Sequence, residues 1–184
     1  MRVMISVPSP FNRFQGHKFI GLLIVYAIYT LWYVGPGYFG QLFRLEGYSL
    51  LQSRWFYSGQ TAIEQMATLD AAGRKLKYLA LIFDVPYMIL QGLVFEALIA
   101  FGLNRIKPQN PRWLFLFALP LIFLVADFAE DSFLALTLAT GSAGLGAAAG
   151  AFTALKMLSF VIAIIVSLAI ALWGVLAWRN ISKF

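Results

Sequence analysis

Residues 113–139 read WLFLFALPLIFLVADFAEDSFLALTLA, an apolar run whose only charged members are Asp127, Glu130 and Asp131. As an α-helix, about 20 such residues are enough to cross the hydrocarbon core of a bilayer, which is ~30 Å thick. A carboxylate inside that core is costly unless it is paired, is protonated or faces a water-filled cavity. The stretch therefore predicts a membrane-spanning helix, and it also indicates where the function of the chain lies.

Three further apolar runs accompany this one, at residues 19–34, 78–103 and 152–178. The chain of 184 residues is 61% hydrophobic and only 12% charged, against about 25% charged residues in a soluble domain. We expect an all-α polytopic membrane protein, residues 1–184 forming one transmembrane domain built as a four-helix antiparallel bundle. Residues 104–112 form a short turn, and residues 140–151 (TGSAGLGAAAGA) are expected to form a flexible turn.

The longest connection, between the first two spans, contains a predicted amphipathic helix at about residues 62–72. Thr61 and Glu64 fit a capping box at its start, apolar residues then recur at helical spacing, and Gly73 offers a stop. Such a helix would lie on the membrane surface and cover the outer mouth of the bundle. The alternative is a connector that only hides its apolar face in the interface.

The charges outside the spans predict an orientation. One side carries only basic residues: Arg2, Arg13, Lys18, Arg105, Lys107, Arg112, Arg179 and Lys183. The other side, residues 35–77, has five basic and three acidic residues. Because positive loops stay cytoplasmic, we expect both termini in the cytoplasm, in a bacterial inner membrane.

Five of the eight acidic residues lie within predicted spans, and four of them are expected to meet. Asp127, Glu130 and Asp131 share one helix face, since residues three and four apart are neighbours. Asp84 in the second span and Lys156, placed at the outer end of the fourth, can reach the same outer-half cavity. Three adjacent carboxylates cannot all ionise in a low dielectric, so at least one is expected to hold a proton.

Three other polar residues of the second span are given separate roles. Tyr87 and Gln91 are candidate hydrogen-bonding partners of a ligand, and Gln91 lies seven residues from Asp84, on the same face. Glu96 lies nearer the cytoplasm on another face and is expected to stand apart from the cluster. The aromatic residues near span ends, including Trp32 and Tyr33, are expected to be interfacial belt residues.

The leading functional hypothesis is an acidic cavity that binds a hydrophobic small molecule and transforms it by acid–base chemistry. The ligand would be a lipid, an isoprenoid or a sterol-like compound. Asp127 and Glu130 would share a proton as acid and base, Asp84 would orient the ligand or act as a second base, and Asp131 and Lys156 would support them.

Two alternatives remain open. The first is a proton-coupled carrier, which would use Glu96 as its inner step and would need a homodimer. The second is a non-catalytic subunit whose charges form a structural network. The expected partners are membrane lipids and the small molecule.

Several site classes find no support. The chain has no cysteine, which excludes thiol catalysis and cysteine-ligated metals. The basic residues flank the spans, so no nucleic acid is expected. An Asp-x-x-Glu-Asp stretch could bind magnesium, but neither intramembrane prenyltransferase nor CDP-alcohol phosphotransferase motifs are intact. We predict no metal and no cofactor.

The order of short motifs resembles a group of small bacterial four-span integral membrane proteins. The shared features are a loop helix ending in Gly73-Arg74, an aspartate at Asp84, an Asp-x-x-Glu at Asp127 and Glu130, and a Leu-Lys at Leu155-Lys156. The resemblance covers residues 58–178. It implies the four-span fold and carries no activity.

Overall fold

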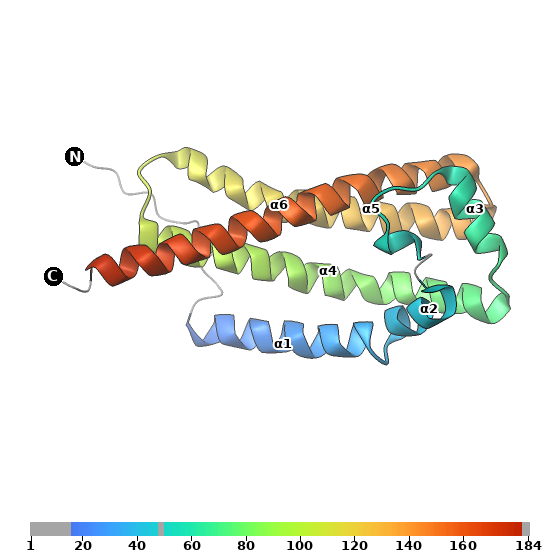
Figure 1. Ribbon diagram of the computed structural model, residues 1–184, viewed down its shortest axis with the longest axis horizontal. Coiled ribbons are helices and arrows are strands. Elements are labelled where there is room, and N and C mark those ends of the chain that lie inside the picture. Colours follow the sequence, from blue (N-terminus) through green and yellow to red (C-terminus); the bar gives the residue numbers. More distant parts are fainter. Residues whose placement is uncertain (1–15, 48–49, 182–184) are drawn as a thin grey trace.

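The computed structural model describes residues 16–47 and 50–181, and this part of the chain is helical without strands (Figure 1). Four of its helical segments are long and apolar enough to cross a membrane. In such helices the backbone N–H and C=O groups away from the ends and from Pro86 are bonded within the segment, as the absence of water in hydrocarbon requires. The chain is therefore an all-α integral membrane protein, as its composition predicts.

The long helices are α1 (His17–Val34), α4 (Ala71–Ile106), α5 (Ala118–Thr140) and α6 (Ala143–Ile181). A 3-10 helix, η3 (Pro111–Phe117), leads into α5. Successive long helices run in opposite directions, so α1 begins and α6 ends at the same end of the bundle (Figure 1). We call this the terminal end and the opposite end, which carries the connection from α1 to α4, the loop end. The predicted four-helix antiparallel bundle is confirmed.

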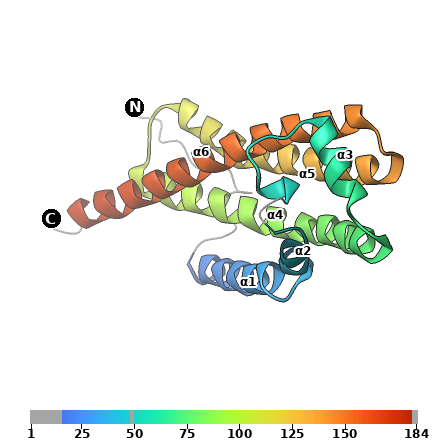
Figure 2. The same cartoon turned by 45° about the vertical axis from the view of Figure 1, so that its right-hand side comes forward.

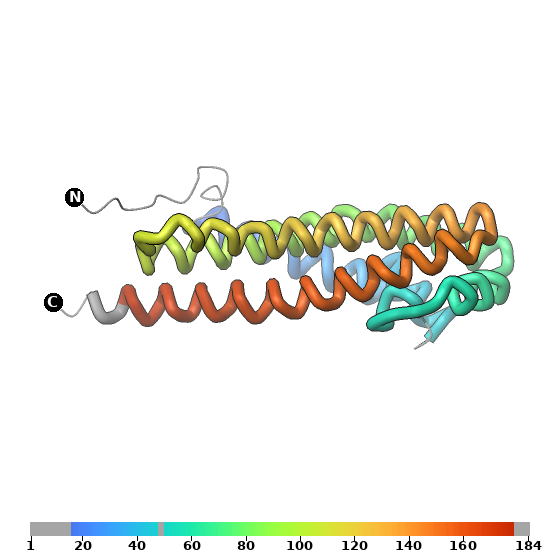
Figure 3. Tube along the Cα trace, turned by 90° about the horizontal axis from the view of Figure 1, so that it is seen from above, coloured from blue at the N-terminus to red at the C-terminus, as the bar shows by residue number. Residues whose placement is uncertain are grey.

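Helix α6 changes its neighbour along its length. It packs along α5 at the loop end, and the two helices diverge toward the terminal end (Figure 3). There α6 crosses α4 at Gly102 and Gly174, where a Cβ added to Gly174 would lie 2.7 Å from the Gly102 Cα. Small residues at a crossing let two helix backbones approach closely. Helix α1 stays peripheral and packs on α4 and α2.

Within the described residues, three short helices cover the loop end: α2 (Tyr38–Glu46), η2 (Leu51–Ser53) and α3 (Gly59–Ala67). Helix α2 packs on α4, and α3 packs on α6 (Figure 2). The predicted loop helix is thus present, but its predicted limits are wrong. Ser58, and not Thr61, caps it, by accepting a hydrogen bond from the Thr61 N–H. Asp70 caps α4, so Gly73 lies inside α4 and does not end the loop helix.

The flexible turn expected at residues 140–151 is also wrong, because α6 already begins at Ala143. The turn itself needs only Gly141, in the left-handed region with φ 68°, and Ser142. Alanine favours the helix, and the glycines of this stretch serve packing. Gly146 lies against Gly59, and Gly150 lies against the backbone of Tyr57. The small side chains let the loop pack directly on α6.

Candidate functional site

Three charged residues from three helices lie at one level of the bundle. Asp84 and Lys156 are each thirteen residues beyond the first residue of their helix, and Asp127 is thirteen residues before the last residue of α5. At a rise of about 1.5 Å per residue this level is ~20 Å from the helix ends. The prediction that Lys156 lies at the outer end of its span is therefore wrong, since α6 starts earlier than the sequence pattern suggested.

Lys156 is the cation of the site. Its ammonium group lies 3.1 Å from Asp127 Oδ1 and also forms an ion pair with Glu130 Oε2. Glu130 is completely buried, and Asp127 and Lys156 are 4% and 8% exposed. Ion pairs this deep require excellent geometry, because the desolvation of both charges offsets their attraction. One lysine therefore links α6 to two successive turns of α5.

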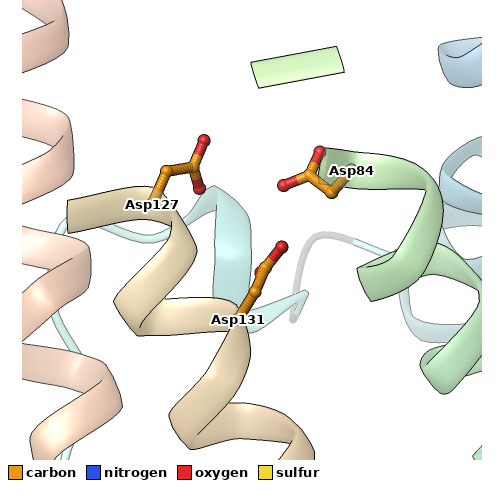
Figure 4. A group of neighbouring side chains, drawn as sticks. All are labelled: Asp84, Asp127 and Asp131. Carbon is orange, nitrogen blue, oxygen red and sulfur yellow. The ribbon is translucent and has the colours of Figure 1, made fainter. Parts of the chain in front are cut away.

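Asp84 approaches this group from α4. The ligand oxygens of Asp84, Asp127 and Asp131 all lie within 4.8 Å of one another, and the three side chains point toward a common space (Figure 4). On the far side of Asp84, the Tyr33 hydroxyl at the end of α1 donates a 2.7 Å hydrogen bond to Asp84 Oδ1. Tyr33 is only 1% exposed, so its expected place in an interfacial belt is wrong.

The connection at the loop end supplies two further polar side chains. Gln52 of η2 donates a 3.1 Å hydrogen bond from Nε2 to Asp131 Oδ1. Tyr57, also buried, interacts electrostatically with Glu130 and Lys156. Burial, with the Glu130 carboxylate adding to it, raises the pKa of the Tyr57 phenol above its ordinary value. Tyr57 therefore presents a neutral hydroxyl to the cluster.

We call Asp84, Asp127, Glu130, Asp131 and Lys156 the carboxylate cluster. Its formal charge is three negative units when every group is ionised, because four acids face one lysine. The nearby donors from Tyr33 and Gln52 are neutral and do not change this sum. In a low dielectric such an excess is relieved by protons shared between neighbouring carboxylates, or by a bound cationic or proton-donating group.

A cavity of about 170 Å³ adjoins the cluster, and three of the cluster residues, Asp84, Asp127 and Lys156, line it. Gln52 lines it as well. Its remaining lining is mostly apolar and aromatic and comes from α1, α2, α4, α5 and α6: Tyr33, Val34, Phe39, Tyr87, Gln91, Phe123, Met157 and Phe160. Val34 is 48% exposed on the lipid-facing helix α1, so the cavity reaches the side of the bundle.

The structure separates the three other polar residues of α4. Tyr87 and Gln91 both line the cavity. Gln91 is 7% exposed, and its amide makes no hydrogen bond within residues 16–47 and 50–181. Tyr87 packs against Tyr33 with ring centroids 5.0 Å apart. Glu96 is half-buried, does not line the cavity and forms no ion pair with the described part of the chain.

Sequence reasoning missed Tyr33, Gln52 and Tyr57. Tyr33 carries the signature of a belt residue because it ends an apolar run, and Gln52 and Tyr57 lie in a loop without periodicity. Ser53 and Arg54 lie between Gln52 and Tyr57, so no pattern in the sequence marks either residue as buried. The partners themselves follow only from the fold.

The three aspartates could also hold a hard cation through oxygen ligands, while the Lys156 ammonium already supplies positive charge beside Asp127. Comparison of the chain with protein-family models, with curated proteins and with solved structures finds no match.

Proposed function

We propose that this protein binds the polar end of a hydrophobic small molecule, such as a lipid, an isoprenoid or a sterol-like compound, and acts on it by acid–base chemistry. The observation that carries the proposal is the composition of the cavity. Aromatic and aliphatic walls lead from the lipid-exposed Val34 to the charged residues Asp84, Asp127 and Lys156. A molecule with a polar end and an apolar body matches both parts.

The size of the cavity supports partial enclosure of the ligand. Pockets that enclose a drug-sized molecule measure about 300–1,000 Å³, whereas this cavity measures about 170 Å³. It has room for a polar group and a few carbon atoms. The rest of the ligand would lie along α1 and α6 in the membrane, so membrane lipids are the natural source of ligand.

Within the cluster, Asp127 and Glu130 are the proposed acid–base pair. Both contact Lys156, whose charge stabilises their ionised forms, and their mutual proximity favours a shared proton. Asp84, which is oriented by Tyr33, would accept a hydrogen bond from the ligand or serve as a second base. Gln91, with its unpaired amide at the cavity wall, would bind a ligand oxygen.

The membrane assignment belongs to the same proposal. We place the chain in a bacterial inner membrane with the terminal end in the cytoplasm, since the basic residues at that end have no acidic neighbours in the loops. The cluster then lies in the outer half of the bilayer, below the cover formed by α2, η2 and α3.

Two other functions make different use of the same residues. A proton-coupled carrier needs a polar path to both ends, with Glu96 on the inner half and a homodimer to complete it. A structural network requires only that the charged residues hold the helices together. The excess of carboxylates favours a functional site. A cluster that served only packing would be more stable with fewer acids, because their mutual repulsion would be smaller.

The test is lipid analysis and native mass spectrometry of protein purified in detergent. We expect one hydrophobic species to co-purify with the wild-type chain and to be lost from Asp127→Asn while the bundle remains folded. Glu96→Gln is the matched control, as it removes an intramembrane acid outside the cavity, and it should retain the ligand. Equal retention by Asp127→Asn would contradict the proposal. Dissipation of a pH gradient in liposomes, abolished by Glu96→Gln, would identify a carrier instead.

A further inference from the structure

A second buried ion pair lies between the carboxylate cluster and the loop end. Lys77 of α4 is 1% exposed, and its Nζ lies 3.5 Å from Glu46 Oε2 at the end of α2. Gln65 of α3 donates a hydrogen bond to the same carboxylate oxygen. The proposed chemistry uses none of these residues. Two helices of the cover, α2 and α3, thus meet α4 around an ion pair that is buried from bulk water.

This ion pair continues the cluster toward the loop end. Lys77 and Asp84 are seven residues apart, two turns on the same face of α4, and Lys77 interacts electrostatically with Asp131 and Glu130. Gln52 reaches Asp131 from the cover. At the loop end itself, α3 carries exposed polar side chains next to Gln65, including Glu64. Polar side chains therefore lie at successive levels between the cluster and the loop end, beside the apolar group that contains Leu81 and Leu134.

Several polar atoms in this series have no hydrogen-bond partner among the described residues. They are Gln65 Oε1, Lys77 Nζ, Gln52 Oε1 and Asp131 Oδ2. The 3.5 Å separation in the Lys77 ion pair also exceeds the about 2.7–2.9 Å of a charge-assisted hydrogen bond. Buried groups of this kind are normally satisfied, and ordered water is the usual partner where protein atoms are missing.

Two packed layers on the opposite side of the cluster, toward the terminal end, are apolar. Met88, Phe95, Phe123 and Ala163 pack together next to the cavity. A second layer follows, formed by Ile99, Ala100, Leu103, Phe117 and Ile170. Ser167 is buried on this side, and its hydroxyl donates a hydrogen bond to the Ile164 carbonyl of its own helix. The residues of these two layers include no ionisable side chain, and Glu96, which follows Phe95 on α4, is half-buried outside them.

We propose that a hydrated route connects the carboxylate cluster with the loop end of the bundle through Gln52, Lys77 and Gln65, and that it is closed toward the terminal end. The route admits water, protons and small monovalent cations. It would let the cluster exchange protons with one side of the membrane only. It does not rest on the proposed ligand, because it follows from the unpaired polar atoms and the apolar layers alone.

The absence of cysteine in the chain provides a direct test. Single cysteines would be introduced at Gln52 and Gln65 and challenged with Ag⁺, a thiol-reactive cation small enough to follow a narrow aqueous path. The matched controls are Leu51→Cys and Ala62→Cys, each close in sequence to a test residue. Both control positions are fully buried and pack against apolar neighbours. Each variant would be reconstituted in sealed vesicles of known orientation, and its folding checked by thermal unfolding. Modification would be read as protection from a fluorescent maleimide after denaturation.

We expect Gln52→Cys and Gln65→Cys to react roughly tenfold faster than their controls, since a thiol ionises readily only where water reaches it. The reaction should require Ag⁺ on the loop-end side. Ser167→Cys, which lies on α6 between Ala163 of the first apolar layer and Ile170 of the second, should stay unreactive from both sides. Equal rates for test and control cysteines would overturn the route, and reaction of Ser167→Cys from the terminal side would overturn its one-sidedness. Neither measurement involves ligand, so co-purification of a lipid can succeed or fail independently.

Discussion

The Tyr33 hydroxyl donates a 2.7 Å hydrogen bond to Asp84 Oδ1 and thereby joins the end of α1 to the middle of α4. Both side chains are buried, and Tyr33 also packs against Tyr87. Helix α1 also packs on α4 through Leu22, and its Tyr29 hydroxyl donates a 2.8 Å hydrogen bond to the Phe83 carbonyl. The Tyr33 phenol thus couples the lipid-exposed helix to the carboxylate cluster and forms part of the cavity wall.

Tyr33→Phe removes this hydrogen bond and keeps the ring packing. We expect a loss of about 1.5–3 kcal/mol of stability, the range for hydrogen bonds to charged groups. Thermal unfolding in detergent measures it. Tyr38→Phe is the control, because the Tyr38 hydroxyl makes no hydrogen bond within the described part of the chain. Equal effects of the two substitutions would contradict a specific role for the Tyr33 hydroxyl.

Lys156→Met removes the cation that faces Asp127 and Glu130 and retains most of the side-chain volume. Leaving a buried charge without its partner costs about 3–5 kcal/mol, so the variant should be strongly destabilised. The double variant Lys156→Met with Glu130→Gln should recover part of this loss, and the four proteins form a double-mutant cycle for unfolding. Strict additivity would show that the ion pair contributes nothing.

Gly174→Ala tests the crossing of α4 and α6. The new Cβ would lie 2.7 Å from the Gly102 Cα, closer than backbone atoms tolerate, so the helices must separate. Overpacking of this kind costs about 1–3 kcal/mol. Gly21→Ala, in α1, meets nothing within 4 Å and should be neutral or stabilising by up to about 1 kcal/mol. Thermal unfolding of both variants in the same detergent gives the comparison.

Ser58→Ala tests the corrected start of α3. The Ser58 hydroxyl accepts the Thr61 N–H at 3.1 Å, and loss of such a cap costs about 1 kcal/mol. The effect should appear as faster proteolysis of the loop between α2 and α3. Thr68→Ala removes a hydroxyl bonded only to the Gln65 carbonyl at the other end of α3, and it should leave the proteolysis rate unchanged.

Much of the site follows from local spacing. Asp127, Glu130 and Asp131 share a face by helix periodicity, and Asp84 and Gln91 do so on α4. The structure brings Asp84, Asp127, Glu130, Asp131 and Lys156 together. The depth of Lys156 could not be predicted, because the small residues of 140–151 look like a loop and are a helix. Lys77 was counted among flanking charges, although it lies buried next to Glu46.

The sequence by itself determined four membrane-spanning helices and their antiparallel order. Apolar runs in hydrocarbon must bond their backbones internally, and short connections force neighbouring spans to alternate. Only the tertiary structure decided which polar partners each buried acid meets. Tyr33 reaches Asp84 across 51 residues and Gln52 reaches Asp131 across 79. Such pairs depend on how the helices and the loop-end cover pack, and helical periodicity carries no information about that beyond a single helix.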